Sequence, residues 1–292
     1  MWGAGRAISL QPTRPPVAEV FDPHNCILGE GPLWHPERGE LFWFDIIGKE
    51  LRTRDRFWRF DDYVSAAGWV DRETLLIASS RALSRFDIDT GAAEPLVELE
   101  AGNPLTRSND GRADPWGGFW IGTMGVKLEP EAGAIYRFHR GELRTLFERI
   151  TVPNAICFAP DRSTAYWCDT ERQQIMRQPL APGDGWPLGP SEVLIDLTGT
   201  DYRPDGAVTD AEGNIWNAQW GAGRVACYGP DGRFKSAVEV GGRQSSCPAF
   251  GGADFSTLFV TTAAEGLDGA EEGRTYRATT AGRGRPEYRV IL

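Results

Sequence analysis

Short apolar strands separated by turns recur along the whole chain. Six times, a turn residue such as Asp, Glu, Gly, Ser or Thr is followed by a short apolar and aromatic run. The six runs are marked by Leu41, Leu75, Phe119, Ala165, Ile215 and Leu258. They lie 34 to 50 residues apart, so the pattern predicts six copies of one structural unit.

Each unit has room for about four strands. A strand of alternating polarity follows most of the six runs, as in residues 81–86 and 133–138. Turn residues then lead to a third strand, for example Asp89-Thr90-Gly91 before residues 95–99, and another apolar stretch precedes each run. Four strands in such a repeat are typical of a propeller blade.

We therefore predict an all-β fold, a six-bladed β-propeller with four antiparallel strands per blade. Residues 18–21 fall outside the six units, and a strand there would complete the last blade and close the ring. We expect residues 1–17 to be an N-terminal extension and residues 18–292 to be a single propeller domain. The alternative, a pair of β-sandwiches, does not explain a sixfold repeat.

Polar residues occupy one repeat position in four of the six units. Each lies ten or eleven residues before the apolar run of its unit: Glu30, Asn109, Asn154 and Asp205. The equivalent positions in the other two units hold Ser65-Ala66 and Cys247. First strands of propeller blades line the central channel, so we expect the four side chains to meet at one end of it. The alternative is that they only cap turns, because each lies near Gly or Pro.

Two carboxylates and two amides that face one another cannot all stay buried without a partner, because like charges repel and desolvation is costly. A cation resolves this conflict. Glu30, Asp205 and the side-chain carbonyl of Asn154 are hard oxygen donors, which favour Ca²⁺, Mg²⁺ or Mn²⁺ and leave Zn²⁺ open. We expect one divalent metal ion here, with coordination positions left for water or substrate.

Composition excludes several classes of partner. The 292 residues include 41 Asp and Glu against 31 Lys and Arg, a net charge of -10, which argues against binding nucleic acid. No apolar run approaches the ~18 residues of a membrane span, and the first residues lack a secretory core. We expect a cytoplasmic protein with no membrane association and no obligate protein partner.

Covalent catalysis has little support in the sequence. There is no G-x-S-x-G motif, and the three histidines lie outside the converging positions. Five cysteines without a C-x-x-C pair are too few for a disulfide framework, so we expect buried reduced thiols.

These motifs resemble the regucalcin/gluconolactonase (senescence marker protein) family of six-bladed propellers, from about Cys26 to Ala264. The phrases that carry the resemblance are Leu28-Gly29-Glu30-Gly31-Pro32-Leu33-Trp34, Arg107-Ser108-Asn109-Asp110-Gly111-Arg112, Trp120-Ile121-Gly122-Thr123-Met124, Pro153-Asn154-Ala155-Ile156, Pro204-Asp205-Gly206 and Cys247-Pro248-Ala249-Phe250-Gly251-Gly252. The resemblance implies hydrolysis of sugar-acid lactones with a single divalent ion held by Glu30, Asn154 and Asp205. It also implies substrate contacts from Arg107 and Asn109.

Lactone hydrolysis needs a polarised carbonyl, a positioned water and a stabilised oxyanion, which a divalent ion in an open site supplies. Asp205 would take the proton from water, which agrees with the base role that the resemblance implies. Asn109 would donate to a sugar hydroxyl or ring oxygen, and Arg107 would hold a polar oxygen or carboxylate.

Lys127 departs from the family pattern. Some relatives carry an acidic substrate contact at this place, whereas this chain has a lysine. Arg107 and Lys127 together suggest a substrate with an extra carboxylate, such as an aldaric or uronic lactone. The alternative is that Lys127 is an ordinary solvated surface residue.

Two other functions remain open from the sequence. The first is a calcium-binding or partner-binding propeller without catalysis, which would tolerate loss of Asp205. The second is a calcium-dependent hydrolase of aryl esters or phosphotriesters, which would prefer aromatic esters. Eleven tryptophans do not decide the matter, because blade cores also use them.

Overall fold

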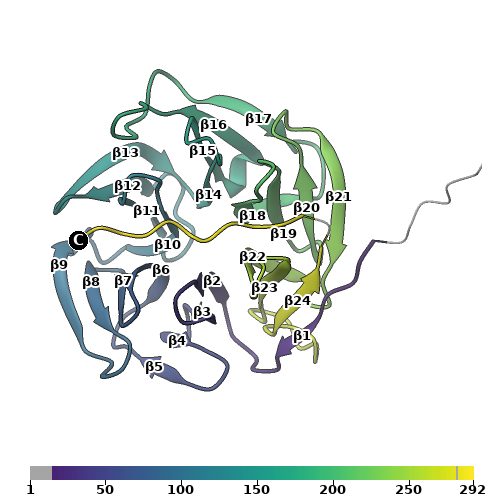
Figure 1. Cartoon of the computed structure of the whole chain (residues 1–292), viewed down its shortest axis with the longest axis horizontal. Helices are drawn as coiled ribbons and strands as arrows, with labels where there is room; N and C mark the ends of the chain where they lie inside the picture. Colours follow the sequence, from purple (N-terminus) through teal and green to yellow (C-terminus); the bar gives the residue numbers. More distant parts are fainter. Residues whose placement is uncertain (1–14, 281) are drawn as a thin grey trace, which may run out of the picture.

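The computed structural model describes residues 15–280 and 282–292, which form six four-stranded antiparallel sheets in a ring (Figure 1). This arrangement confirms the predicted six-bladed propeller. Among the described residues, the only helical element is the 3₁₀ turn η1 (Thr170–Arg172), and no helix is long and apolar enough to cross a membrane.

The first three blades follow one another along the chain. Blade 1 contains β2 (Gly29–His35), β3 (Glu40–Asp45), β4 (Glu50–Arg52) and β5 (Phe57–Arg59). Blade 2 contains β6 (Val64–Asp71), β7 (Thr74–Ser79), β8 (Ala82–Asp87) and β9 (Ala93–Glu98). Blade 3 contains β10 (Thr106–Ala113), β11 (Phe119–Gly125), β12 (Gly133–His139) and β13 (Glu142–Ile150).

The last three blades complete the ring. Blade 4 contains β14 (Pro153–Phe158), β15 (Thr164–Asp169), β16 (Gln174–Pro179) and β17 (Glu192–Asp196). Blade 5 contains β18 (Arg203–Thr209), β19 (Ile215–Trp220), β20 (Arg224–Tyr228) and β21 (Phe234–Glu239). Blade 6 contains β22 (Gln244–Gly251), β23 (Thr257–Ala263), β24 (Thr275–Thr279) and the N-terminal strand β1 (Glu19–Asp22).

Blade 6 closes the ring with both ends of the propeller sequence. β1 pairs antiparallel with β24, where Glu19 lies opposite Arg277. Figure 1 shows the two strands side by side. The predicted closing strand is therefore confirmed, and it covers an edge that would otherwise be open to other chains.

The six apolar runs of the sequence are the second strands of the blades, and they build the core between neighbouring sheets. Between blades 1 and 2, large side chains from both sheets pack together with almost no exposure: Phe42, Phe44, Leu75, Ile77 and Phe86. The five cysteines are buried and free, as predicted. Close packing of this kind supplies the main stabilisation of a sheet stack.

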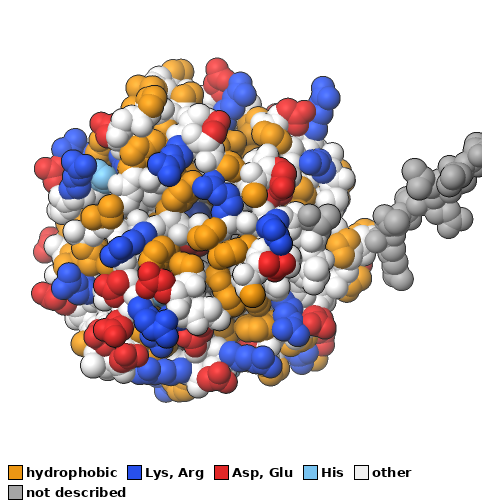
Figure 2. Space-filling view, viewed as in Figure 1, with side chains coloured by type: hydrophobic (Ala, Val, Ile, Leu, Met, Phe, Trp, Pro, Cys, Tyr) orange, Lys and Arg blue, Asp and Glu red, His pale blue; other side chains and the backbone are white. Residues whose placement is uncertain are grey.

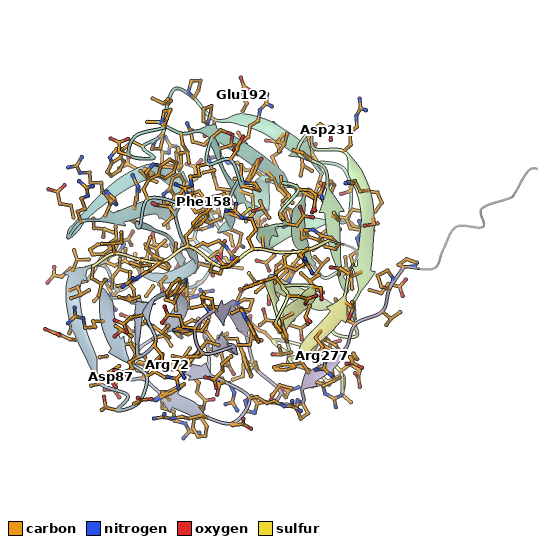
Figure 3. The ribbon with its side chains drawn as sticks, in the orientation of Figure 1. Arg72, Asp87, Phe158, Glu192, Asp231 and Arg277 are labelled. Carbon is orange, nitrogen blue, oxygen red and sulfur yellow. The ribbon has the colours of Figure 1, made fainter. Side chains whose placement is uncertain are left out.

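Several charged side chains extend outward at the edge of the ring. In Figure 3, Asp87, Glu192 and Asp231 extend outward, whereas Phe158 lies further in, on the first strand of blade 4. Phe158 packs edge-on against Trp120, with 5.3 Å between ring centroids. Figure 2 shows acidic and basic side chains interspersed over this face of the molecule.

Every first strand has a break in its pairing near the same end. The register against the second strand shifts between Glu30 and Leu33, Val64 and Ala66, Ser108 and Gly111, Asn154 and Cys157, Pro204 and Ala207, and Ser245 and Cys247. Such bulges re-aim the side chains that they contain. The polar residues singled out in the sequence lie at these bulges, which explains their constant offset from the apolar runs.

The chain ends as a strap across the opposite end of the channel. Residues 282–292, called the C-terminal strap below, cross the middle of the ring in Figure 1. The Val290 N–H donates to the Trp69 carbonyl and the Ile291 N–H donates to the Gly117 carbonyl, each at 2.9 Å. Trp69 lies at the opposite end of β6 from the irregularity between Val64 and Ala66, so the strap covers the end of the channel away from the predicted polar positions.

Candidate active site

A cavity of about 270 Å³ opens at the bulge end of the channel. It is lined by the four polar residues of the repeat, Glu30, Asn109, Asn154 and Asp205. Each of these side chains is nearly buried. The structure therefore brings together the four residues that the sequence analysis placed at one end of the channel.

The remaining wall of the cavity combines apolar and charged side chains. The apolar part consists of Leu28, Met124, Leu128, Val152 and Trp220. The polar part consists of Arg107, Thr170, Glu171, Arg203 and Glu265. A small pocket with an apolar wall and a few converging polar groups is typical of a small-molecule site.

The sequence analysis missed several of these residues. Arg203 and Glu171 form an ion pair of 3.3 Å at the mouth of the cavity, where both side chains are about half exposed. Arg203 directly precedes Pro204-Asp205-Gly206, so its neighbourhood was visible in the sequence. Glu171 lies in η1 and had no comparable signal. Being exposed, the pair contributes little to stability and remains free to rearrange around a substrate.

Arg107 and Lys127 are placed differently. Arg107 is 9% exposed and lines the cavity, and burial lowers the pKa of its guanidinium. Its Nη1 group donates to Asn109 Oδ1 and to the Ser108 carbonyl, each at 2.9 Å. Lys127 is exposed and does not line the cavity, although the next residue, Leu128, does. The structure thus does not bring Lys127 together with the other predicted site residues.

A chain of hydrogen bonds fixes the orientation of both amides. Arg107 can only donate, so the amide oxygen of Asn109 faces it, and Asn109 Nδ2 donates to Asn154 Oδ1 at 3.1 Å. At the other end, the Thr170 hydroxyl donates to the Pro204 carbonyl at 2.7 Å. Thr170 therefore accepts from Asn154 Nδ2, at 2.9 Å. The Arg107 end and the Thr170 end of this series of hydrogen bonds require the same orientation of the two amides. This orientation leaves one lone pair of Asn154 Oδ1 for a further ligand.

Asn109 is more occupied than the sequence analysis assumed. Besides its bond to Asn154, its Nδ2 group donates to the Pro153 carbonyl at 3.0 Å. Both amide hydrogens are therefore in use. The expected donation from Asn109 to a sugar oxygen stays a prediction, and it requires one of these two bonds to be exchanged for the substrate.

The two carboxylates are held in a setting that disfavours their charge. Burial, followed by the charge of Asp110, raises the pKa of Glu30 to about 8. Burial, followed by the charge of Glu30, raises the pKa of Asp205 well above its ordinary value. Neither carboxylate forms a salt bridge with any residue that the structure describes. A cation bound between them would remove this cost.

Glycines beside the carboxylates permit this close packing. Gly31 has φ +52°, and a Cβ atom there would lie 2.3 Å from the Ser65 carbonyl oxygen. A Cβ atom at Gly206 would lie 2.3 Å from Cys247 Sγ. The first strands of neighbouring blades therefore approach each other through positions where no side chain fits.

The two blades without a carboxylate or amide use serine at the bulge. Ser65 Oγ donates to the Asn109 carbonyl at 2.6 Å, and Ser246 Oγ donates to the Gly29 carbonyl. The bulge residue of blade 6 is therefore Ser246, one position before the cysteine expected there, because the break in register falls between Ser245 and Cys247. These serines tie their blades to the backbone of the strands that carry the site.

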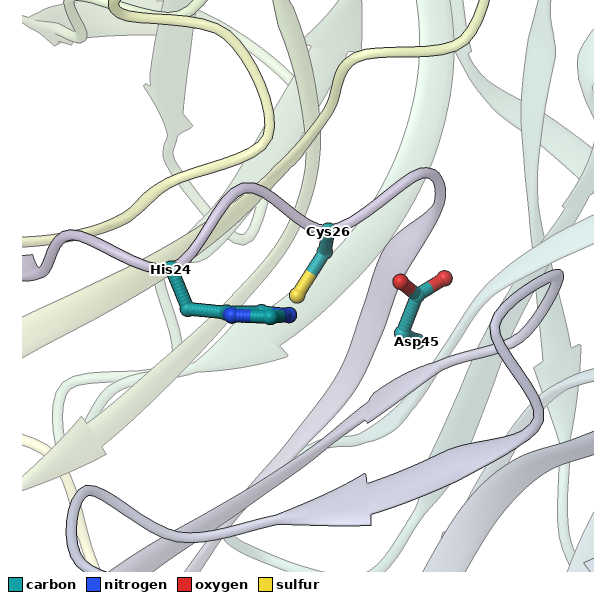
Figure 4. A group of neighbouring side chains, drawn as sticks. All are labelled: His24, Cys26 and Asp45. Carbon is teal, nitrogen blue, oxygen red and sulfur yellow. The ribbon is translucent and has the colours of Figure 1, made fainter. Parts of the chain in front are cut away.

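A second cluster of metal-binding residue types lies away from this cavity. His24, Cys26 and Asp45 bring one ligand atom each within 4.8 Å of one another (Figure 4). The Asp45 carboxylate accepts backbone N–H bonds from Ile27, Leu28 and Gly48, at 2.9, 3.1 and 2.9 Å. Burial raises the pKa of the Cys26 thiol, which keeps it protonated.

An equivalent aspartate in blade 4 indicates the role of Asp45. Asp169 ends β15 as Asp45 ends β3, and it accepts the N–H groups of Thr151 and Val152 at 3.0 Å each. Both aspartates therefore cap the loop that enters the first strand of their blade. We assign this structural role to Asp45.

Several known proteins are related to this chain in sequence. Residues 28–264 match the model of the SMP-30/gluconolactonase/LRE-like region. A Rhizobium meliloti protein named as a sugar lactone lactonase is 40% identical over 277 residues, which cover 90% of this chain and 94% of that protein. L-arabinolactonase of Azospirillum brasilense is 36% identical over 252 residues, which cover 82% of each chain.

A solved structure agrees over nearly the whole chain. The calcium-binding protein regucalcin from Agrobacterium tumefaciens superimposes with a TM-score of 0.92 at 41% identity, covering 95% of this chain and 98% of that one. Together with the six bulged blades, these matches show that the chain belongs to the SMP-30/gluconolactonase/LRE-like family.

Proposed function

We propose that this protein is a metal-dependent hydrolase that opens sugar-acid lactones, with one divalent ion held by Glu30, Asn154 and Asp205. The observation that carries the proposal is a small cavity with two buried carboxylates of raised pKa, which have no salt-bridge partner among the described residues. The names of the relatives, a sugar lactone lactonase and an L-arabinolactonase, support the substrate class.

The donor atoms suit a hard cation. Two carboxylates and one amide oxygen are the ligand types of Ca²⁺, Mg²⁺ and Mn²⁺, and the relative named as calcium-binding agrees with this choice. The residues that line the cavity include no histidine or cysteine, the ligands most typical of Zn²⁺ sites. The orientation of Asn154, fixed by Thr170, presents its oxygen and not its nitrogen to this position.

A divalent ion held by these residues would polarise the lactone carbonyl and lower the pKa of a water molecule. Asp205 accepts a proton as the water oxygen attacks the carbonyl carbon. The bond between that carbon and the ring oxygen then breaks, and Asp205 returns the proton to the ring oxygen. The products are one hydroxyl group and one carboxylic acid, which ionises and releases a proton to solution.

The other lining residues bind and orient the ring. Arg107 uses Nη1 to hold Asn109, so its remaining N–H groups are the ones that reach a substrate oxygen. Met124, Val152 and Trp220 provide apolar contact surface, which limits the water around the reacting bond.

The test is hydrolysis of a panel of lactones, followed by acid release in weak buffer. Gluconic, galactonic, arabinonic, xylonic and aldaric lactones would be compared after EDTA treatment and after adding back Ca²⁺, Mg²⁺, Mn²⁺ or Zn²⁺. We expect turnover of at least one lactone that disappears with EDTA and returns with a hard divalent ion. Folded, metal-loaded protein with no turnover above the spontaneous rate on any of these lactones would contradict the proposal.

A further inference from the structure

The strap end of the channel contains a buried ion pair that reaches toward the site. Arg112 on β10 is 8% exposed, and its guanidinium pairs with the Glu287 carboxylate of the C-terminal strap. Counted by side-chain atoms alone, Arg112 and Glu287 are each 9% exposed. The Glu287 carbonyl also accepts the Trp69 indole N–H at 2.8 Å, which anchors this part of the strap to blade 2.

The other donors of Arg112 bind the backbone of two neighbouring blades. Nε donates to the Ile156 carbonyl of blade 4 and Nη2 donates to the Ala207 carbonyl of blade 5, each at 3.0 Å. Asp110, two residues earlier on the same strand, accepts the Ile156 N–H at 2.8 Å. One strand of blade 3 therefore holds both polar groups of Ile156.

Ile156 lies inside one of the bulges that carry the proposed metal ligands, and Ala207 ends the other, where pairing with β19 resumes. The bulge of β14 runs between Asn154 and Cys157, and that of β18 runs between Pro204 and Ala207. Bulged residues are not held by the regular ladder of a sheet, so they depend on other partners. Arg112 supplies a partner to the carbonyl inside one bulge and to the carbonyl at the end of the other.

We propose that Arg112 and Glu287 are positioning residues for the metal site: the strap carboxylate holds the guanidinium that ties together the bulges of Asn154 and Asp205. This inference rests on the proposed function, because it takes Asn154 and Asp205 as metal ligands. Glu287 touches none of the residues that line the cavity in the hydrogen bonds and ion pairs of the described chain. Its effect on the metal therefore passes through Arg112.

The experiment is titration of the metal-free protein with Ca²⁺ or Mn²⁺ alone, by calorimetry. We expect Glu287→Gln to weaken metal binding by about 10-fold to 100-fold, the range found when groups that orient metal ligands are lost. At saturating metal, kcat of the variant should lie closer to that of the parent than its metal affinity does, because we place Glu287 outside the substrate cavity.

Arg285→Gln is the matched control. Arg285 also lies in the strap, where it donates to the Pro160 carbonyl and the Tyr288 hydroxyl, and its described hydrogen bonds do not include Arg112. Its loss should leave metal affinity within about 2-fold of the parent, by the usual size of surface effects. If both variants lower thermal stability and neither changes metal affinity, the strap is only structural and the inference is overturned.

A double variant keeps the test decisive if Glu287→Gln does not fold. Replacing both partners, in Arg112→Met with Glu287→Met, removes the buried charges together and leaves an apolar pair that folded proteins tolerate. It also removes the donors to Ile156 and Ala207, so we expect weakened metal binding in a folded protein. Unchanged affinity in this variant overturns the inference alone, whereas a parent protein that binds no divalent metal overturns the proposed function and this inference with it.

Discussion

The two ends of the channel treat buried charge in opposite ways. On the side that faces the strap, Asp110 lines a small cavity together with Arg112 and Glu287, and burial raises its pKa only to about 6. At the cavity end, Asp205 is equally buried but faces Glu30, and its pKa rises well above the ordinary value. A buried charge is stable when a partner compensates for its lost hydration. The described residues supply that partner at the strap side and supply no salt-bridge partner to Glu30 or Asp205 at the cavity.

Asp205→Asn should lower activity more than any other substitution considered. The substitution keeps the size of the side chain, removes one negative charge and removes the group that takes the proton from water. We expect kcat/KM for the best lactone to fall by about 1000-fold, since a general base alone contributes about 100-fold to 10,000-fold. Steady-state kinetics at saturating metal measure the loss.

Asp231→Asn is the control for this substitution. Asp231 lies on the same blade, at the outer rim in Figure 3, and should leave kcat/KM unchanged. A lactonase activity that survives in Asp205→Asn within about 10-fold would remove Asp205 from the role of base.

The raised pKa of Glu30 predicts strong pH dependence of metal binding. A carboxylate must lose its proton to bind a metal, so each proton displaced costs about 10-fold in affinity per pH unit below the pKa. With a pKa of about 8 for Glu30, affinity should fall by about 50-fold between pH 8, where half of the carboxylate is charged, and pH 6. Calorimetry in buffers of different ionisation enthalpy would also count the protons released. Equal affinity at both pH values would show that the carboxylates are already charged in the metal-free protein.

The raised pKa of Glu30 also predicts how the stability of the metal-free protein depends on pH. Glu30 has a higher pKa in the folded protein than its ordinary value of 4.5, so the folded state binds the proton more tightly than the unfolded chain. This contribution to stability is complete below the ordinary pKa and is lost as pH rises through about 8. Added metal should therefore raise the unfolding temperature more at pH 8 than at pH 6, which thermal unfolding with and without Ca²⁺ would measure.

Thr170→Val tests the single hydrogen bond that orients the Asn154 side chain. The valine keeps the shape of the side chain but offers no acceptor to Asn154 Nδ2, so the amide is no longer fixed with its oxygen toward the proposed metal. We expect about 10-fold weaker metal binding, at the lower end of what lost orienting groups cost. Thr198→Val, on the exposed rim of the same blade, is the control. Unchanged metal affinity in Thr170→Val would mean that Asn154 does not ligate the ion.

Periodicity explains which parts of the site were visible in the sequence. Glu30, Asn109, Asn154 and Asp205 were found because the bulge falls at the same place in each first strand, so a constant offset marks a shared position in space. The closing strand β1 was visible for a similar reason, because it was left over after six units had been counted.

Residues outside the repeat carry no such signal. The strap belongs to no blade, so nothing in its sequence links Glu287 to Arg112. The lining residues Glu171 and Glu265 come from turns and loops after second strands, whose positions vary from blade to blade. Even within the repeat, the predicted position can be wrong by one residue: the bulge of blade 6 holds Ser246, whereas the constant offset indicated Cys247.

Lys127 was expected at the site by counting along its loop, but the structure places it outside the cavity. Its substitution should therefore change activity less than the others. Its side chain is exposed outside the cavity, while the ion pair of Arg203 and Glu171 occupies the mouth. Lys127→Ala should change kcat/KM for neutral and aldaric lactones by less than about 2-fold, and equally for both, because an exposed charge acts weakly through water. Arg203→Ala should instead change the ratio between the two substrates. A selective loss of aldaric lactone turnover in Lys127→Ala would show that the loop moves to bring this lysine onto the substrate carboxylate.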